Sequence, residues 1–244
     1  MNIEIERYLK MQRECYDYLA SGWSVHKRDP VVGCFDEHET WEDYSYLFDG
    51  MFDFHDNADY LQKASELVIL DFGCGPARSL VKYGKHFKRI DGEDISADVI
   101  QKARDWLTDR DAWNHNRLFV CSGQDLEEIE SDYYDAVMST ITLQHICVYS
   151  IRLRLFEEFF RVIKKGGWFT AQMGFGAGKK GSVPYKTDYC EAITTNGWYD
   201  TRVEDPNDLR SDLESVGFSE FKYFVRPAGP CDSHPSWIFF RARK

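Results

Sequence analysis

The sequence lacks the features that take a chain into a membrane or onto a nucleic acid. Its 244 residues contain no apolar run near the roughly 20 residues that a membrane span requires, and the N-terminal MNIEIERYLK has no apolar signal-peptide core. Lys and Arg number 30 against 41 Asp and Glu, which gives a formal net charge of -11 at pH 7. A surface of that sign repels phosphate backbones. We expect a cytoplasmic protein without membrane contact, with nucleic acid disfavoured as a partner.

Cysteine is present in an odd number, and no two of the 7 cysteines stand close enough in sequence for a zinc knuckle. Reduced thiols are the default in a cytosolic chain, so we expect neither a disulfide framework nor a metal site. Hydrophobic residues make up 43% of the chain and aromatic residues 16%. That composition supplies a core and excludes a mainly disordered protein.

Residues 1–62 read differently from the rest of the chain. Apolar residues recur at helical spacing near the N-terminus, which predicts an amphipathic helix over the first 20 residues. The following segment 34–60 combines nine acids and eight aromatic residues with no Lys or Arg, and it shows no strand pattern. We expect residues 1–62 to form a helical cap or lid on a domain that spans residues 63–244.

Strand and helix patterns alternate through that domain. Strands are predicted at 67–73, 88–94, 117–123, 134–140 and 168–174, with helices at 97–107 and 154–165, the latter ending at Gly166-Gly167. Residues 174–204 read as an irregular insertion, followed by a helix at 206–218 and an antiparallel strand pair at 219–226 and 236–243. The expected fold is α/β: a doubly wound, mostly parallel seven-stranded sheet with an antiparallel C-terminal strand.

A glycine-rich loop follows the first strand in the string Asp71-Phe72-Gly73-Cys74-Gly75-Pro76-Ala77-Arg78. Glycines at this place let the backbone turn sharply and approach a ligand closely. A dinucleotide fingerprint needs a small residue where Arg78 stands. A P-loop needs a Gly-Lys-Ser/Thr sequence that does not follow. Both of these readings fail.

Five ordered motifs across residues 67–173 resemble those of the class I S-adenosylmethionine-dependent methyltransferases. The loop resembles D/E-x-G-x-G-x-G, with Ala77 at the last glycine, and residues 92–96 resemble G-x-D-x-S. Residues 134–139 resemble F-D-x-V, residues 143–146 resemble L-x-H-I, and residues 164–169 resemble the L-K-P-G-G-x-F turn. The resemblance implies S-adenosylmethionine as cofactor and S-adenosylhomocysteine as product.

The resemblance also implies roles for residues around the first two strands. The loop backbone at Gly73, Cys74 and Gly75 would lie along the methionine moiety, and Asp71 would act on its ammonium group. Asp94 ends the second strand, where an acid accepts hydrogen bonds from both ribose hydroxyls, and Ile95 would pack on the adenine. Glu93 is expected to point away from this site because side chains alternate along a strand.

The segment after the third strand departs from the family. Ser122 stands where relatives often carry an acid that reads the adenine amino group, so Gln124 or Asp125 would replace it, beside a backbone amide at Gly123. Ser139, at the end of the fourth strand, completes the expected cofactor-binding set.

Methyl transfer from a sulfonium mainly requires alignment of the acceptor and exclusion of water. A general base is needed only when the acceptor must lose a proton, as a hydroxyl does. His145 leaves the fourth strand near the expected site, and an ordinary imidazole pKa of about 6.5 suits a base. A capping or packing role is the alternative for the same residue.

The acceptor pocket must come from outside the common core. Its candidates are the insertion and the aromatic residues of the N-terminal segment, namely Tyr16, Trp23, His26, Trp41, Tyr44 and Tyr46. Aromatic rings with interleaved acids suit either a cationic amine or a sugar, and packing alone is the third reading.

The predicted function is methyl transfer to an oxygen or nitrogen of a small molecule or sugar. The alternatives are a protein or nucleic-acid methyltransferase and a binding protein without turnover. No N/D-P-P-Y/F motif follows the fourth strand, and Pro230-Cys231 lies too far along the chain for a cytosine-attacking thiolate. Five basic residues are expected on one solvated helix face: Arg152, Arg154, Arg161, Lys164 and Lys165. Oligomeric state is not predicted.

Overall fold

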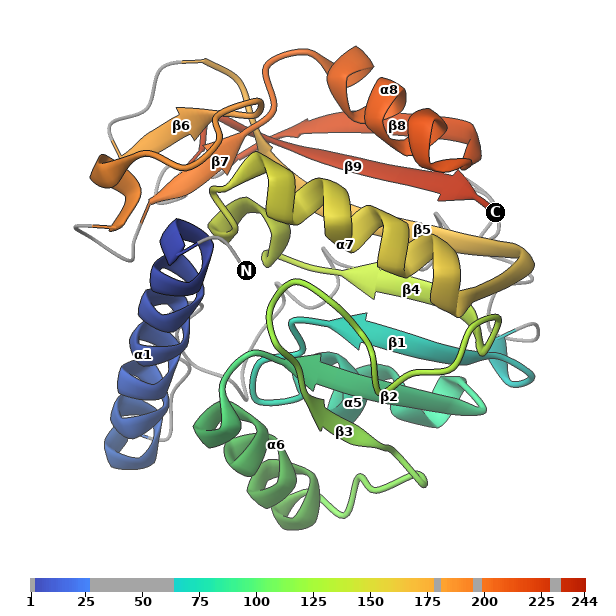
Figure 1. The fold of residues 1–244 in the computed structure, drawn as a ribbon. Coiled ribbons are helices and arrows are strands. Elements are labelled where there is room, and N and C mark those ends of the chain that lie inside the picture. The colour runs from blue at the N-terminus through green and yellow to red at the C-terminus, as the bar shows by residue number, and fades with distance from the viewer. Residues whose placement is uncertain (1–2, 27–63, 178–180, 195–198, 229–233) are drawn as a thin grey trace.

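A computed structural model describes residues 3–26, 64–177, 181–194, 199–228 and 234–244 (Figure 1). The helices are α1 (Ile3–His26), α5 (Arg78–Tyr83), α6 (Ala97–Asp109), α7 (Tyr149–Val162) and α8 (Pro206–Val216), with short 3-10 turns η1 (Gly84–His86), η2 (Leu143–His145) and η3 (Glu191–Thr194). The strands are β1 (Val68–Phe72), β2 (Arg89–Asp94), β3 (Leu118–Val120), β4 (Tyr134–Ser139), β5 (Ile163–Phe175), β6 (Ser182–Pro184), β7 (Asp200–Arg202), β8 (Ser219–Pro227) and β9 (Ser236–Arg243).

The main sheet has seven strands in the order β3-β2-β1-β4-β5-β9-β8. The strands from β3 to β5 pair in parallel, whereas β9 is antiparallel to both β5 and β8. This arrangement confirms the fold expected from the sequence. The chain order reverses between β1 and β4, so the crevice at their carboxyl ends is the expected place for a ligand.

Helices bury both faces of the sheet, and alternate residues of β1 show the two cores. Leu70 belongs to a cluster with Leu155 and Phe159 of α7, while Ile69 belongs to a second cluster with Leu107 of α6. A parallel strand covered on both faces must be apolar almost throughout, which explains the continuous run in the sequence.

The α7–β5 junction corrects two expectations. Helix α7 ends at Val162, not at the glycine pair, and β5 begins at the next residue. Gly166-Gly167 instead lies within β5, where the register with β4 jumps, and a Cβ on Gly167 would lie 2.5 Å from the Asp135 carbonyl oxygen. The pair therefore forms a strand irregularity that needs glycine.

The five basic residues do not share one solvated helix face. Lys164 and Lys165 belong to β5, and Arg152 is fully buried. The Arg152 guanidinium donates hydrogen bonds to the carbonyl oxygens of Ile146 and Tyr185. It therefore ties the loop after β4 to the insertion.

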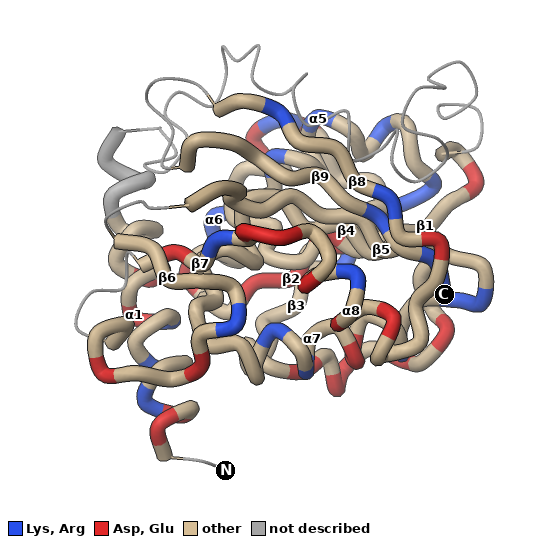
Figure 2. The backbone as a smooth tube through the Cα atoms, turned by 90° about the horizontal axis from the view of Figure 1, so that it is seen from above, with Lys and Arg blue, Asp and Glu red and all other residues tan. Residues whose placement is uncertain are grey.

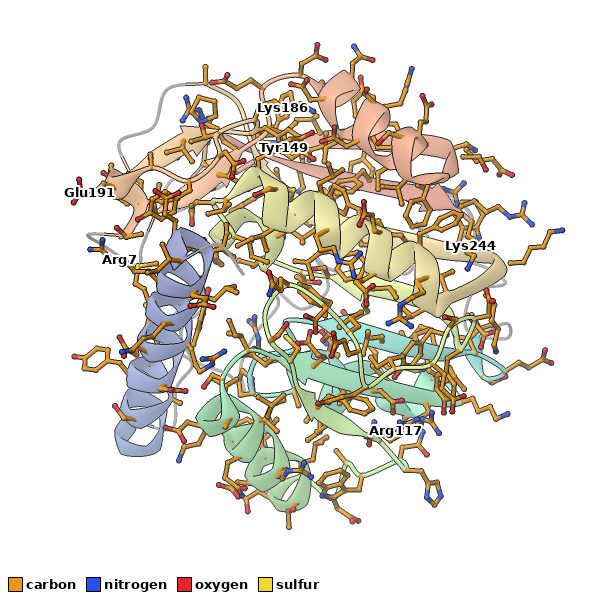
Figure 3. All side chains as sticks on the ribbon, viewed as in Figure 1. Arg7, Arg117, Tyr149, Lys186, Glu191 and Lys244 are labelled. Atoms are coloured by element: carbon orange, nitrogen blue, oxygen red, sulfur yellow. The ribbon has the colours of Figure 1, made fainter. Side chains whose placement is uncertain are left out.

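The insertion at 174–204 is more regular than the sequence predicts. β6 and β7 pair in parallel as a separate two-stranded sheet, and Phe175 bridges to Val203. Lys186 donates to the Asp212 carboxylate on α8 at 2.5 Å and to the Tyr149 hydroxyl at 3.0 Å, and Figure 3 shows Lys186 close to Tyr149. β6 and β7 have only three residues each, and a run that short shows no recognisable alternation of apolar and polar residues.

The N-terminal helix α1 stands beside the carboxyl ends of the central strands, on the side of β6 and β7 (Figures 1 and 2). Its buried Tyr8 hydroxyl donates to the His145 carbonyl oxygen at 3.0 Å and accepts from the Cys147 N–H at 2.7 Å. Ser96, at the start of α6, donates to Asp17. These contacts attach α1 to the loop after β4 and to the start of α6.

The sequence expectations for residues 34–60 lie outside the described residues. So do Trp41, Tyr44, Tyr46 and the Pro230-Cys231 pair, together with the side chains of Trp23 and His26. The five cysteines within the described ranges form no disulfide bond. No helix of those ranges is both long and apolar enough to cross a membrane.

Candidate active site

A cavity of about 890 Å³, counting the part open to solvent, lies at the carboxyl ends of the central strands. We call it the main cavity. Its lining residues come from α1, the end of β1 with the glycine loop, the end of β2 with the start of α6, the β3–β4 connection and the loop after β4: Tyr8, Leu9, Gln12, Tyr16, Phe72, Gly73, Cys74, Gly75, Pro76, Arg78, Glu93, Asp94, Ile95, Val99, Cys121, Gly123, Thr140, Ile141, Thr142, His145 and Ile146.

The glycine loop forms one wall of this cavity. Gly73 has φ 70°, and a Cβ there would lie 2.1 Å from Thr142, so a side chain cannot be accommodated. Gly75 has φ 54° and open space at its Cβ position, which leaves its backbone accessible from the cavity. Ala77 replaces the last glycine yet adopts φ 67°, a conformation that costs an L-residue roughly 1 kcal/mol.

Asp94, the last residue of β2, connects this strand to the glycine loop through its side chain. Its carboxylate accepts the Gly75 N–H at 3.2 Å and the Ser96 N–H at 3.0 Å. Burial raises the pKa of Asp94 to about 6, against the lowering effect of these N–H groups. Each carboxylate oxygen keeps lone-pair capacity for a ligand hydroxyl, and the side chain lines the main cavity.

Asp71 lies next to the main cavity and not in its wall. It lines a smaller adjoining cavity of about 390 Å³ that shares Gly73 and Cys74 with the main one. Burial raises the pKa of Asp71 to about 7, although Ser79 and Arg78 both act to lower it. A ligand ammonium beyond the loop would favour the ionised form of this carboxyl group.

The loop after β3 divides the residues expected to hold adenine. Gly123 lines the main cavity, whereas Ser122, Gln124 and Asp125 line a separate cavity of about 760 Å³, here called the outer cavity. The Ser122 hydroxyl accepts the N–H groups of Gln124 and Asp125, both at 3.2 Å, and so stabilises the turn.

Two further strand-end residues differ from expectation. Ser139 is fully buried and donates to the Phe72 carbonyl oxygen at 3.2 Å, which is a contact between β4 and β1. Glu93, expected to point away, lines both the main and the outer cavity. Strand alternation fails to predict this because Glu93 is next to the last residue of β2, where a long side chain reaches the sheet edge.

His145 forms a hydrogen-bonded cluster with two residues from distant segments. Its Nδ1 lies 2.6 Å from Asp200 Oδ1, and His234 Nε2 lies 3.0 Å from Asp200 Oδ2. Burial alone would raise the pKa of Asp200, but the two histidines outweigh it and hold that pKa well below its ordinary value. A Cβ on Gly174 would lie 2.3 Å from the His234 ring, so the glycine makes room for it.

Helix α1 supplies residues that the sequence analysis did not assign to the cofactor cavity. Tyr8, Gln12 and Tyr16 line it from one helix face, at a spacing of four residues. The Tyr16 ring meets the His145 ring edge-on, with centroids 6.5 Å apart. The sequence could have indicated this shared position, because residues at i, i+4 and i+8 lie on the same face of a helix.

Residues 70–171 match a family described as a methyltransferase domain. The match covers 102 of the 244 residues, so it identifies a methyltransferase domain within the chain. No curated protein sequence matches the chain.

Several solved structures share the fold of this chain. One is a chain from the complex of the Haloferax volcanii Trm112 methyltransferase activator with a methyltransferase: identity is 17%, 92% of this chain and 96% of that chain are covered, and the TM-score is 0.62. A SAM-dependent methyltransferase from Methanosarcina mazei is 16% identical, with 77% of this chain and 98% of that chain covered, and the TM-score is 0.57. Haemonchus contortus phosphoethanolamine N-methyltransferase 2 was solved with phosphomonomethylethanolamine and S-adenosylhomocysteine. It is 17% identical, with 89% of this chain and 59% of that chain covered, and the TM-score is 0.57.

The sequence motifs imply S-adenosylmethionine as the cofactor, and the main cavity fits it chemically. A loop backbone open at Gly75 borders buried acids at Asp94 and Glu93, and Ile95 supplies an apolar wall. Acids suit a ligand that carries an ammonium, a sulfonium and ribose hydroxyls. Within the described ranges, no cluster of His, Cys, Asp and Glu is arranged to hold a metal ion.

Proposed function

We propose that this methyltransferase transfers a methyl group to a hydroxyl or amine of a small molecule or sugar. The His145–Asp200 pair carries the proposal, because it places a base held by a carboxylate in the wall of the main cavity. Asp94 would bind the ribose, Gly73, Cys74 and Gly75 the methionine moiety, and Ile95 and Gly123 the adenine. Asp71 would act on the ammonium group from the adjoining cavity.

S-adenosylmethionine supplies an activated methyl group, so the protein need only position the acceptor, exclude water and accept a proton. His145 would accept that proton at Nε2, since Nδ1 is held by Asp200 at 2.6 Å. The Asp200 carboxylate orients the ring through this contact. Asp200 comes from the insertion, which therefore completes a site that the common core leaves open.

The covering helix α1 supports a small acceptor. Tyr8, Gln12 and Tyr16 of α1 line the main cavity, as a lid that excludes water from a small acceptor would. We propose that residues 1–62 act as this lid on a domain of residues 63–244. The Haemonchus enzyme, solved with phosphomonomethylethanolamine, is a fold neighbour that was captured with a small phosphorylated amine.

Macromolecular acceptors are less well supported. Figure 2 shows Lys and Arg interspersed with Asp and Glu along the described chain, and the net charge of -11 opposes a phosphate backbone. The Haloferax volcanii neighbour was solved with the activator Trm112, so a protein partner is an alternative to test. The five cysteines of the described ranges form no disulfide bond, which supports a reducing, cytoplasmic location.

The first test is calorimetric titration of the purified full chain with S-adenosylmethionine and, separately, with NAD. We expect micromolar binding of the first and none of the second. Transfer of a tritiated methyl group is then measured on matched hydroxyl, amine and thioether acceptors, with and without His145→Gln. Transfer to a hydroxyl or amine that depends on His145 supports the proposal. Equal transfer by wild type and the variant would show that His145 is not the base. If protein or RNA is added as an acceptor and only that acceptor is methylated, the proposed small-molecule or sugar acceptor is wrong.

A further inference from the structure

Glu93 is a buried acid to which the proposed function gives no role. Its side chain is only 1% exposed, and neither carboxyl oxygen has a hydrogen-bond partner of standard geometry among the described residues. Burial of an unpaired polar group is costly, and apolar residues of similar size would fill the same space. A buried acid without a partner at a ligand cavity indicates a contact made by the ligand.

The position of Glu93 connects it to the adenine end of the main cavity. A Cβ on Gly123 would lie 2.6 Å from Ile95, so these two residues are in close contact. The Gly123 N–H in turn donates to the Cys121 sulfur at 3.2 Å, and the Cys121 thiol lies beside the Glu93 carboxyl group. Ile95, Gly123, Cys121 and Glu93 thus form one continuous end of the cavity.

The residues that would otherwise read adenine face elsewhere. Ser122, Gln124 and Asp125 line the outer cavity, and the Ser122 hydroxyl is used by its own turn. Glu93 and Cys121 line both cavities, so they form part of the partition between them. Of the two side chains, the carboxyl group is the stronger hydrogen-bonding group.

The surroundings of Glu93 keep it protonated near neutral pH. Burial raises its pKa to about 8 and outweighs the lowering effect of Cys121 and the Gly73 N–H, while the neighbouring carboxyl groups of Asp94 and Asp71 act in the same direction as burial. The thiols of Cys121 and Cys74 also have pKa values raised well above the ordinary value by burial, so they add no charge. A neutral carboxyl group offers a carbonyl acceptor and an O–H donor side by side.

We propose that the buried carboxyl group of Glu93 hydrogen-bonds the adenine of S-adenosylmethionine and replaces the acid missing at position 122. Adenine presents an amino donor at N6 next to a ring-nitrogen acceptor at N1, which matches the acceptor and donor of a carboxyl group. The proposal rests on cofactor binding in the main cavity. Glu93 therefore determines recognition of the base and takes no part in methyl transfer.

The test measures binding of S-adenosylhomocysteine and of its 6-deamino purine analogue by calorimetry at pH 7. The second ligand carries a hydrogen atom in place of the N6 amino group, so it offers no donor to the carbonyl oxygen of the Glu93 carboxyl group. Wild type is expected to bind it about tenfold more weakly than the first, in keeping with loss of that hydrogen bond. Glu93→Met should weaken S-adenosylhomocysteine about tenfold and abolish the preference, while Glu93→Gln, which keeps an acceptor and a donor, should retain binding.

Two controls separate this role from a structural one. Glu128→Met changes an exposed acid that lines only the outer cavity, and it should bind both ligands as wild type does. Glu93→Met should raise the Tm of the ligand-free protein while weakening binding, because it removes an unpaired buried acid. A merely structural Glu93 would instead move Tm without changing the preference between the ligands.

The outcomes also distinguish the two proposals. Failure of the wild type to bind either ligand would overturn cofactor binding itself and Glu93 recognition with it. Normal wild-type binding with an unchanged preference in a folded Glu93→Met variant would overturn only the role of Glu93. Wild-type affinity should also fall between pH 7 and pH 9 as the carboxyl group ionises, and Glu93→Gln should remove that fall.

Discussion

The Nδ1 atom of His145 lies 2.6 Å from Oδ1 of Asp200, although 55 residues separate the two in sequence. His145 leaves the central sheet after β4, and Asp200 begins β7 of the insertion. The second Asp200 oxygen contacts the buried His234, so the carboxylate is held from both sides. Its position is fixed before any acceptor arrives.

Asp200→Asn is expected to lower kcat by about 10²- to 10⁴-fold, the usual contribution of a positioned base. The amide keeps the shape but removes the carboxylate that holds the Nδ1 atom of His145. Affinity for S-adenosylmethionine should not change. Asp188→Asn, an exposed site in the same insertion, is the matched control. An unchanged kcat would exclude the positioning role.

Asp94→Ala is expected to weaken S-adenosylmethionine binding by about 1–3 kcal/mol, measured by calorimetry. The substitution removes the proposed ribose contact and the acceptor of the Gly75 and Ser96 N–H groups. Asp98→Ala, on the exposed side of α6, should bind as wild type does. If both variants bind equally well, the ribose assignment is wrong.

Tyr8→Phe is expected to lower the free energy of unfolding by about 1–2 kcal/mol, because it leaves the buried Cys147 N–H without its acceptor. Loss of the bond to the His145 carbonyl oxygen should also loosen α1 from the loop after β4. Urea denaturation measures the first effect, and hydrogen exchange in α1 measures the second. Tyr18→Phe, where the side chain is 74% exposed, should change neither. Equal stability of both variants would contradict the anchoring role of Tyr8.

Stability of the ligand-free protein should fall as pH rises from about 5 to 8. Burial raises the pKa of Asp94 to about 6, of Asp71 to about 7 and of Glu93 to about 8, all above the ordinary value near 4. Each group contributes stability that is complete below its unfolded pKa and is lost as pH rises through the folded one. Asp200 has the opposite sign, and its contribution is lost only below about pH 4.

Thermal unfolding at pH 5, 6, 7 and 8 measures this trend. Glu93→Gln removes one of the three titrating groups and should flatten the decline between pH 7 and 8. A Tm that rises steadily from pH 5 to 8 would show that these carboxyl groups are ionised in the folded protein without penalty.

The central sheet could be predicted because its signals are local. The buried run at 67–73 and the glycines at 73 and 75 each lie within a few residues, and β1 and its turn form where expected. The α7 boundary was misplaced because Gly166-Gly167 resembles a helix end, whereas pairing between β4 and β5 draws the chain into a strand at Ile163. Tertiary hydrogen bonding outweighed the local signal there.

The sequence by itself determined the fold class, the glycine loop, Asp94 and the candidate His145, because motif spacing along one strand and its turn encodes them. Only the tertiary structure decided what those residues meet. It brought Asp200 and His234 to His145 and placed Tyr8 and Glu93 in the wall of the main cavity. These contacts join segments far apart in the chain, and they depend on how the insertion and α1 pack against the sheet, which no local pattern specifies.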